Sequence, residues 1–534
     1  MWGFLCSLLV LATGTFSIEN EILYIRHGIP PAREPEIRTS PQWFRLTQRV
    51  DHFNPADNRT WQMRYIQNNA FYEEGGPMFV FIGGEWTIST GWITSGLFFD
   101  IAQMHNATLF YTEHRFYGGS YPINNLETDS LKYLSADQAL ADLTYFIEYQ
   151  KQNTPGLQNS TVVVAGSSYA GTLATWAKLK YPHIVDIAYC SSGPLHAKAD
   201  FTEYFDVVEE TLRLASPTCP EVIRRAMSEA MEMLETPEGS ANFSRIFRSC
   251  NPVNGSVEPD RSYFLTSLSS PFANAVQTAQ PGDLVSVCER LENHTGSDVE
   301  KLANYIVPQG SCIWTYDFFK DYYSGTQIIG TNRLRQWLYQ TCTEYGWYQT
   351  QAFGNTFTID LYYQICIDLF GEVFGSSTLY TGIERTNLFY GSIEPEVTRL
   401  ITCHGTGDPW YKMGLLNDLN ENAITILVNG TSHSADLYSI RDSDSDELKQ
   451  AKIRIMNTIS AWIYEIEGEG GSTATIPVTT TTINPGIITT NVPIPTSPPT
   501  VGNEDNDNNA DNFAISNAPT MAIFLSVLLI LLTC

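Results

Sequence analysis

One serine in the chain lies in a setting that suits a nucleophile. The hexapeptide Gly166-Ser167-Ser168-Tyr169-Ala170-Gly171 follows the apolar segment 161–165 and precedes a helical pattern over 172–180. A sharp turn between a buried strand and a helix can project a serine oxygen above a sheet, and small neighbours let the backbones approach closely there. Short small-residue turns of this kind are also common in proteins without a catalytic serine. The string therefore makes Ser168 a candidate nucleophile and requires partners elsewhere.

Two further loops supply a candidate base and a candidate acid. His433 lies in the loop just after the apolar segment 423–428, and Asp408 lies in a turn after the segment 398–402. Loops at the carboxyl ends of parallel strands are where binding sites collect. A single histidine is more often structural, and Gly, Asp and Pro favour turns for conformational reasons alone. The order Ser168, Asp408, His433 along the chain, however, is that of the α/β-hydrolase triad.

The elements that must position these residues alternate between strand and helix. Apolar runs predict strands, and a Ser135–Gln138 capping pair predicts a helix to about residue 150. From about residue 200 to 394 the segments are longer and richer in helix formers. The predicted strands are 77–82, 107–111, 161–165, 184–189, 398–402 and 423–428, and a closing helix spans about 444–466. This pattern predicts a parallel α/β sheet interrupted by an inserted, mainly helical domain.

Long motifs surround the three candidates. They are Gln48-Arg49-Val50-Asp51-His52-Phe53-Asn54, Gly83-Gly84-Glu85, Glu113-His114-Arg115-Phe116-Tyr117-Gly118, 133–135 with 138–143, 180–183, Asp408-Pro409-Trp410 and 433–437. Over about residues 43–466 the chain resembles the lysosomal and secreted serine peptidases that include Pro-Xaa carboxypeptidase, dipeptidyl peptidase II and thymus-specific serine protease. Tyr-Ala-Gly after the serine is most similar to the thymus-specific branch. The chain departs from the family at Ser167, where glycine is usual, and at His404, where asparagine is common.

The resemblance implies an α/β-hydrolase core with a helical cap and a serine exopeptidase that needs no metal or cofactor. Ser168 would attack a peptide carbonyl, His433 would take its proton, and Asp408 would orient the imidazole. Backbone N–H groups of Tyr169 and Gly84 would hold the oxyanion. Glu85 is a candidate substrate contact, with a structural loop residue as the alternative. Cleavage after proline is expected from the family, and the resemblance leaves carboxypeptidase and dipeptidyl peptidase modes open.

A second function class is also compatible with the sequence. The protein could be a hydrolase-fold surface glycoprotein that has lost activity and acts by binding. The altered serine motif motivates this hypothesis, as does an N-glycosylation sequon at Asn429, four residues before His433. A lipase or esterase is a third reading because the fold serves many acyl transfers.

The two ends of the chain predict processing and attachment. Residues 1–17 predict a secretory signal peptide, because an apolar run is followed by small residues near Ser17. An N-terminal membrane anchor is the alternative, but the run is shorter than the roughly 20 residues that span a bilayer. Residues 18–39 are compatible with a removable pro-segment. Residues 471–512 predict a Thr/Pro-rich and acidic stalk, and 513–534 a lipid-anchor signal or, alternatively, a short membrane helix. Between the ends we expect core residues 40–190, an inserted cap 191–395 and core residues 396–470.

Composition argues against nucleic acid as a partner and for a compartment in which disulfides form. The 534 residues include 31 basic and 58 acidic side chains, a formal charge of −27, which disfavours nucleic acid. Cys6 and Cys534 lie in the terminal segments, and the even number that remains predicts disulfides. These candidates are Cys190, Cys219, Cys250, Cys288, Cys312, Cys342, Cys366 and Cys403, and none has the Cys-x-x-Cys spacing of a zinc site.

Seven sequons agree with a secretory route. They are at Asn58, Asn106, Asn159, Asn242, Asn254, Asn293 and Asn429. We therefore expect a protein of the secretory pathway that is extracellular or at the cell surface, with a lysosomal location open. We expect peptide substrates and membrane contact through the C-terminal segment. A homodimer is compatible with the sequence.

Overall fold

The computed structural model describes residue 32 and residues 39–307, 310–329 and 334–470. All of them fall within the unit 20–472. The predicted signal peptide, stalk and lipid-anchor signal lie outside the described residues, as does almost all of the predicted pro-segment.

Within the described chain, eight strands form one sheet in the order β1-β2-β4-β3-β5-β6-β11-β12. The strands are β1 (Gln42–Arg49), β2 (Thr60–Asn68), β3 (Met78–Ile82), β4 (Thr108–Thr112), β5 (Val162–Ser167), β6 (Ile187–Ser191), β11 (Leu400–Gly405) and β12 (Ala423–Val428). β2 pairs antiparallel with β1 and with β4, and the pairs from β4 to β12 are parallel. Every residue of β3, β4, β5, β6 and β11 is buried. Such burial explains why these strands are continuous apolar runs in the sequence.

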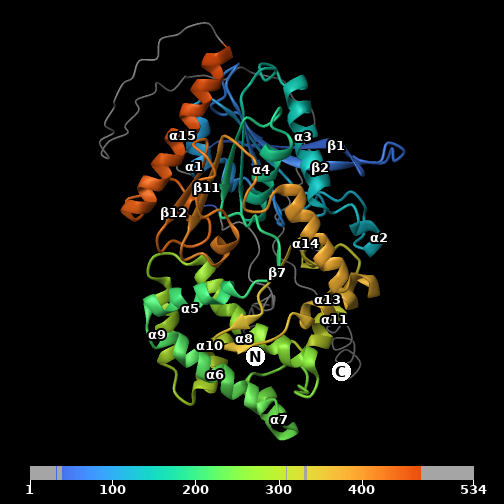
Figure 1. The fold of residues 1–534 in the computed structure, drawn as a ribbon, viewed down its shortest axis with the longest axis vertical. Helices are drawn as coiled ribbons and strands as arrows, with labels where there is room; N and C mark the ends of the chain where they lie inside the picture. The colour runs from blue at the N-terminus through green and yellow to red at the C-terminus, as the bar shows by residue number, and fades with distance from the viewer. Residues whose placement is uncertain (1–31, 33–38, 308–309, 330–333, 471–534) are drawn as a thin grey trace, which may run out of the picture. The chain divides into compact units, whose positions relative to one another are not determined.

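Helices cover both faces of the sheet (Figure 1). α3 (Ala136–Asn153) and α4 (Tyr169–Lys180) pack on one face through residues such as Phe146 and Trp176. α1 (Leu97–Met104) and α15 (Asp446–Gly470) pack on the other through residues such as Ile459. Ser135 caps α3 as predicted, since its side chain accepts from the backbone N–H of Gln138 at 3.3 Å. Each face of the sheet is thus buried beneath its own helices.

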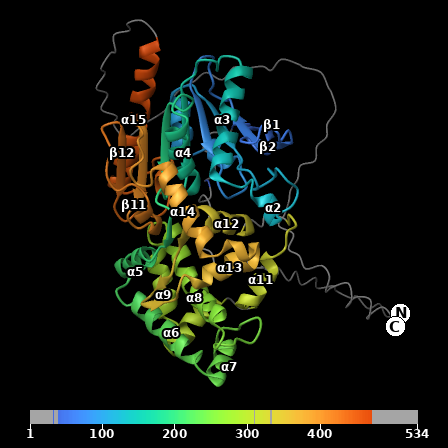
Figure 2. The same cartoon turned by 45° about the vertical axis from the view of Figure 1, so that its right-hand side comes forward.

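A long, mainly helical insertion joins β6 to β11. It appears in green to orange in Figures 1 and 2. Its helices are α5 (Glu203–Ala215), α6 (Cys219–Met233), α7 (Pro237–Ile246), α8 (Glu258–Thr278), α9 (Asp283–Glu292), α10 (Asp298–Ile306), α11 (Tyr316–Tyr323), α12 (Leu334–Gln340), α13 (Asp360–Phe370) and α14 (Ser376–Tyr390). Two short strand pairs, β7 (Lys198–Asp200) with β8 (Gly346–Tyr348) and β9 (Gln351–Ala352) with β10 (Asn355–Thr356), complete it. We call this insertion the cap.

Short helical turns complete the described elements. They are η1 (Gly91–Ile93), α2 (Thr128–Leu131), η2 (Thr341–Tyr345), η3 (Glu372–Phe374), η4 (Pro409–Met413) and η5 (Ala435–Leu437). η2 is a single π-helical turn, a feature that often marks a functional region.

The strand order identifies the architecture. In the sheet, β5, β11 and β12 occupy the fifth, seventh and eighth places in chain order, and the cap enters between the sixth and the seventh. A mostly parallel eight-stranded sheet with helices on both faces and an inserted helical cap is an α/β-hydrolase. The predicted fold class is therefore confirmed. The antiparallel strands β1 and β2 have no counterpart in the strands predicted from the sequence.

The disulfide prediction was wrong for two of the eight cysteines. In the described chain the bridges are Cys219–Cys288, Cys250–Cys312 and Cys342–Cys366, all within the cap. Cys190 and Cys403 are free and buried. They lie on adjacent strands one position out of register, so their side chains point to opposite faces of the sheet. No bridge between them can form in this fold.

No helix among the described residues has the length and apolar character needed to cross a membrane.

Candidate active site

Ser168 lies at the turn between β5 and α4. Its backbone is in a strained conformation, with φ 54° and ψ −132°, and its N–H donates to the carbonyl of Ser191 at 2.9 Å. A Cβ on Gly166 would approach the carbonyl oxygen of Ala170 to 2.1 Å, so this position requires glycine. The turn is therefore the sharp strand-to-helix elbow expected from the sequence, and it leaves Ser168 8% exposed.

Asp408 and His433 form a buried pair on two neighbouring loops. Nδ1 of His433 lies 2.8 Å from Oδ2 of Asp408, and both side chains are at most 2% exposed. The other carboxylate oxygen accepts from the backbone N–H of Trp410 at 3.0 Å. Because an ionised carboxylate only accepts, Nδ1 carries the proton in this pair. Nε2 of His433 has no hydrogen-bond partner in the described chain, so it is available to receive a proton.

The neighbours of Ser168 and His433 are hydrogen-bonded to each other. Oγ of Ser167 lies 2.7 Å from Oγ of Ser434. The described chain holds no hydrogen bond between Ser168 Oγ and His433 Nε2. Catalytic hydrogen bonds are often long in unliganded enzymes and tighten when substrate binds. The structure thus joins base to acid directly, and joins nucleophile to base through the residues beside them.

A buried carboxylate behind the histidine loop was not assigned a role from the sequence. Asp436 accepts from Ser191 Oγ at 2.8 Å and from the hydroxyl of Tyr189, both on β6. Burial raises the pKa of Asp436. These contacts tie the loop after β12 to the strand next to the elbow. The only sequence signal was the motif Ala435-Asp436-Leu437.

The cap contacts the histidine loop at the end of α8. The backbone N–H of His433 donates to the carbonyl of Gln277 at 3.1 Å, and Ser432 Oγ donates to the carbonyl of Ala279 at 2.6 Å. The side-chain oxygen of Gln277 accepts from Trp410 Nε1 at 2.9 Å. One end of a cap helix therefore holds both the loop that carries the base and the turn that carries the acid. Sequence reasoning gave no sign of this contact.

The two candidate oxyanion donors follow neighbouring strands. Tyr169 is the first residue of α4, so the helix provides no acceptor for its N–H. Gly84 follows β3, which pairs with β5. A Cβ on Gly84 would lie 2.5 Å from the indole of Trp86, which explains the glycine. Glu85 is buried. Burial is the main reason why the pKa of Tyr169 is raised, and the charge of Glu85 adds to it, so this carboxylate lies near the elbow.

Comparison with known proteins identifies the family. A family model described as serine carboxypeptidase S28 matches residues 48–455. The chain belongs to this family. The thymus-specific serine protease of Mus musculus is 31% identical over 454 residues, which cover 79% of this chain and 87% of that protein. The lysosomal Pro-X carboxypeptidase of Homo sapiens is 25% identical over 470 residues, or 83% of this chain and 92% of that protein.

A solved structure of proline iminopeptidase from Mycobacterium smegmatis matches 80% of this chain and 100% of its own, with 10% sequence identity and a TM-score of 0.32. The family match confirms the resemblance inferred from the motifs. The chain is a serine-type peptidase, and its substrates are peptides.

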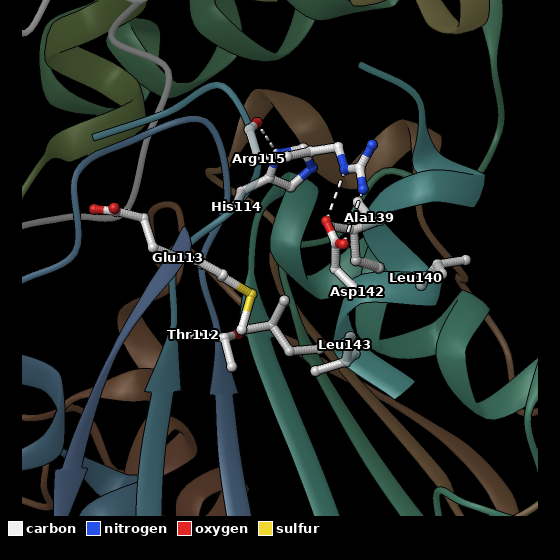
Figure 3. A pocket seen from close by; sticks show the side chains of 12 residues that line it. Thr112, Glu113, His114, Arg115, Ala139, Leu140, Asp142 and Leu143 are labelled. Atoms are coloured by element: carbon white, nitrogen blue, oxygen red, sulfur yellow. Dashed lines mark hydrogen bonds and ion pairs between the residues drawn. The ribbon is translucent and has the colours of Figure 1, made fainter. Parts of the chain in front are cut away.

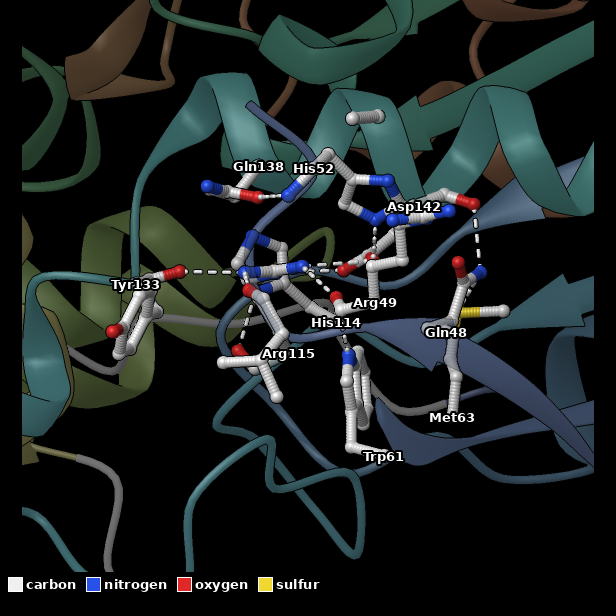
Figure 4. Close-up of polar contacts among 12 residues, drawn as sticks. Gln48, Arg49, His52, Trp61, Met63, His114, Arg115, Tyr133, Gln138 and Asp142 are labelled. Atoms are coloured by element: carbon white, nitrogen blue, oxygen red, sulfur yellow. Dashed lines mark hydrogen bonds and ion pairs between the residues drawn. The ribbon is translucent and has the colours of Figure 1, made fainter. Parts of the chain in front are cut away.

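Arg115 of the motif Glu113-His114-Arg115 takes part in a buried ionic network with Asp142 and His52. The guanidinium of Arg115 makes two hydrogen bonds to Asp142, at 2.7 and 2.8 Å, and Nε2 of His52 lies 2.7 Å from the same carboxylate (Figure 4). Burial alone would raise the pKa of Asp142, but the nearby Arg115 and His52 outweigh it and lower the pKa. These motif residues therefore anchor β1, β4 and α3 to one another.

A small cavity beside this network has a volume of about 20 Å³, which is room for about one water molecule (Figure 3). Thr112, Glu113, Leu140 and Leu143 line it with Arg115 and Asp142. It is too small for a peptide side chain.

The motif also supports the elbow from behind. Nε2 of His114 lies 3.2 Å from the hydroxyl of Tyr169, and burial lowers the pKa of His114 to about 4. The same hydroxyl accepts from Gln340 Nε2 at 2.9 Å and from the hydroxyl of Tyr345 at 3.1 Å, both in the cap. The residue after the candidate nucleophile is thereby tied to both the core and the cap of the S28 peptidase.

A cleft of about 730 Å³ opens on the outer side of the histidine loop. Its lining includes Asp206 and Glu210 of α5, Lys412, and Ser432 and Ala435 of the histidine loop. Ser168 and His433 are not among the lining residues. The cleft is therefore lined by residues of the histidine loop on both sides of His433, and not by the candidate nucleophile or base themselves.

All seven sequon asparagines are exposed, and Asn429 lines the outer cleft.

Among the described residues, no group of three His, Cys, Asp or Glu side chains is arranged to hold a metal ion.

Proposed function

We propose that this S28 peptidase is an exopeptidase of the secretory pathway that hydrolyses short peptides, with preference for a bond after proline, through an acyl-enzyme on Ser168. The observation that carries the proposal is the buried Asp408–His433 hydrogen bond, which leaves Nε2 of His433 unpartnered on a loop bonded to the elbow of Ser168.

The reaction has two balanced halves. Oγ of Ser168 attacks the peptide carbonyl while its proton moves to Nε2 of His433, and the imidazolium is stabilised by Asp408. His433 then passes that proton to the leaving amine, and the C–N bond breaks to leave an ester on Ser168. Water attacks the ester with His433 again as base, the C–O bond to Ser168 breaks, and His433 returns the proton to Oγ of Ser168 as the carboxylic acid product leaves.

The oxyanion of both tetrahedral intermediates would accept from the N–H groups of Tyr169 and Gly84. A donor of this kind stabilises the transition state by about 3 kcal/mol. Support comes from their positions at the start of α4 and after β3, the strand adjacent to β5. Glu85, buried in the same loop as Gly84, remains a candidate for substrate contact.

Proline preference is supported by similarity to relatives named lysosomal Pro-X carboxypeptidase. Three disulfides in the described cap fit an oxidising compartment, either outside the cell, at its surface or in the lysosome. A C-terminal lipid anchor remains a prediction, and release of surface protein by a phosphoinositide-specific phospholipase would test it.

Labelling with a fluorophosphonate tests the nucleophile. The wild-type protein should take up one equivalent, mapped to Ser168, and Ser168→Ala should take up none. Ser269→Ala is the matched control, because Ser269 is a buried serine of α8 whose hydroxyl donates to a backbone carbonyl. It should label at the wild-type rate. Equal labelling of wild type and Ser168→Ala would refute the proposed function.

A further inference from the structure

We propose that Ser167 and Ser434 are positioning residues, whose hydroxyl pair holds the histidine loop in place over the elbow. This inference rests on the proposed function, since it assigns how Nε2 of His433 is aimed at Ser168. It concerns two side chains that touch neither the substrate nor the reacting atoms.

The contact is direct and buried. The two hydroxyl oxygens are 2.7 Å apart, and neither side chain is exposed. Ser167 immediately precedes the candidate nucleophile, and Ser434 immediately follows the candidate base. The hydrogen bond therefore joins the two loops at the residues next to the nucleophile and the base. A shift of either loop would have to break it.

Backbone conformation makes this link consequential. Ser168 and Ser434 both have left-handed φ angles, 54° and 55°, which cost energy in residues other than glycine. Such conformations persist only where surrounding contacts hold the backbone in place. At Ser434 two hydrogen bonds do so: its N–H donates to Ser192 Oγ at 2.9 Å, and its hydroxyl pairs with that of Ser167. At the elbow, the N–H of Ser168 is held by the carbonyl of Ser191.

Each loop is thus hydrogen-bonded to the end of β6, and the hydroxyl pair is a direct bond between the two loops. A glycine at position 167, which is usual in the family resemblance described above, could not form that bond. In this chain a side chain at 167 supplies it. In this proposal the departure from the usual serine motif adds a positioning contact.

The expected effect is on rate more than on stability. A bond between neutral hydroxyls contributes modestly to folding. A displacement of about 1 Å between reacting groups, however, can lower a rate by about 10²-fold. Loss of the pair should therefore lower kcat by about ten- to a hundredfold while KM changes less than threefold.

The test is a double-mutant cycle with Ser167→Ala and Ser434→Gly, because glycine tolerates the left-handed conformation at position 434. Each single variant should show the loss in kcat, a fluorophosphonate labelling rate reduced in parallel, and a thermal unfolding midpoint within a few degrees of wild type. The double variant should be no slower than the worse single variant, since both remove the same bond. Ser269→Ala should behave as wild type.

Wild-type kcat in Ser167→Ala or Ser434→Gly, or multiplicative losses in the double variant, would overturn the proposal. If one single variant fails to fold, the kcat of the other decides. Ser168→Ala separates this proposal from the proposed function. If Ser168→Ala is no longer labelled but Ser167→Ala keeps the wild-type kcat, the positioning role of the hydroxyl pair is rejected and Ser168 stands as the nucleophile. Labelling retained by Ser168→Ala rejects the nucleophile itself.

Discussion

Nδ1 of His433 and Oδ2 of Asp408 lie 2.8 Å apart, on loops that leave two adjacent parallel strands, β12 and β11. The second oxygen of Asp408 is held by the N–H of Trp410, so the carboxylate cannot rotate freely. The backbone of His433 is held in turn by the carbonyl of Gln277 in the cap. The orientation of the imidazole therefore depends on the core and the cap together.

Removing the buried guanidinium of Arg115 should strongly destabilise the protein. Arg115→Met leaves Asp142 buried without its main counter-charge, which should cost about 3–5 kcal/mol in the free energy of unfolding. Urea denaturation of the variant measures it. Arg59→Met is the matched control, because Arg59 pairs with Asp57 with half of its side chain exposed and should lose about 1 kcal/mol or less. Similar losses in the two variants would contradict the buried network.

Glu344 should make stability depend on pH. It lies on η2 of the cap and accepts from the N–H of Ala136 at the start of α3, and burial raises its pKa to about 7. The pKa of a glutamate is about 4.5 in the unfolded chain. Between pH 4.5 and 7, Glu344 is therefore ionised in the unfolded chain and still protonated in the folded protein. The contribution of Glu344 to stability is therefore complete below pH 4.5 and declines as pH rises to 7.

The comparison of wild type with Glu344→Gln isolates this contribution. The free energy of unfolding of wild type relative to the variant should fall by up to a few kcal/mol between pH 4.5 and 7.5. Burial lowers the pKa values of His114 and His404 to about 4. Their contribution to the free energy of unfolding therefore has the opposite pH dependence and declines as pH falls below 6.5. Their effect cancels in the difference. A difference that stays constant with pH would refute a raised pKa at Glu344.

Cys190 and Cys403, the two free cysteines of the described chain, should be unreactive until the protein unfolds. Burial raises the pKa of Cys190 to about 12 and that of Cys403 well above its usual range. Iodoacetamide should modify neither in the native protein, and both in denaturant without reductant. Peptide mapping should show that the six cap cysteines require reductant first. Recovery of a disulfide-linked Cys190–Cys403 peptide would contradict the strand register.

A glycan on Asn429 should leave catalysis unchanged. Asn429 lines the outer cleft, which Ser168 and His433 do not line. Enzymatic deglycosylation, or Asn429→Gln, should therefore keep kcat/KM within about twofold of the untreated protein. Asn254→Gln serves as a control, since Asn254 is exposed in the cap. A gain of tenfold or more on removing the Asn429 glycan would favour the binding-glycoprotein hypothesis.

The catalytic candidates could be predicted from sequence because each follows an apolar strand, and strand β12 was predicted with its observed bounds, 423–428. The same reasoning missed β1 and β2. These strands pair antiparallel near the edge of the sheet, and β1 is largely exposed, so neither forms a continuous apolar run.

Contacts between distant segments could not be predicted. In the sequence Cys190 and Cys403 do not differ from the other cysteines, and only the strand register places their side chains on opposite faces of the sheet. The bonds of Ser434 to Ser167 and of His433 to Gln277 join residues far apart in sequence, and no local periodicity encodes them. Burial in the cap likewise decides the state of Glu344, which its sequence neighbours do not reveal.

Peptide turnover by Ser168→Ala tests the central claim most directly. A library of short peptides that includes Xaa-Pro-Xaa sequences should be incubated with the full-length wild-type protein and with the variant, and the products read by mass spectrometry. Wild type should remove residues from one end of the peptides, and the variant should lose at least about 10⁴-fold in kcat while remaining folded. Turnover by Ser168→Ala within tenfold of wild type, or a wild-type protein that cleaves no peptide, would contradict the account.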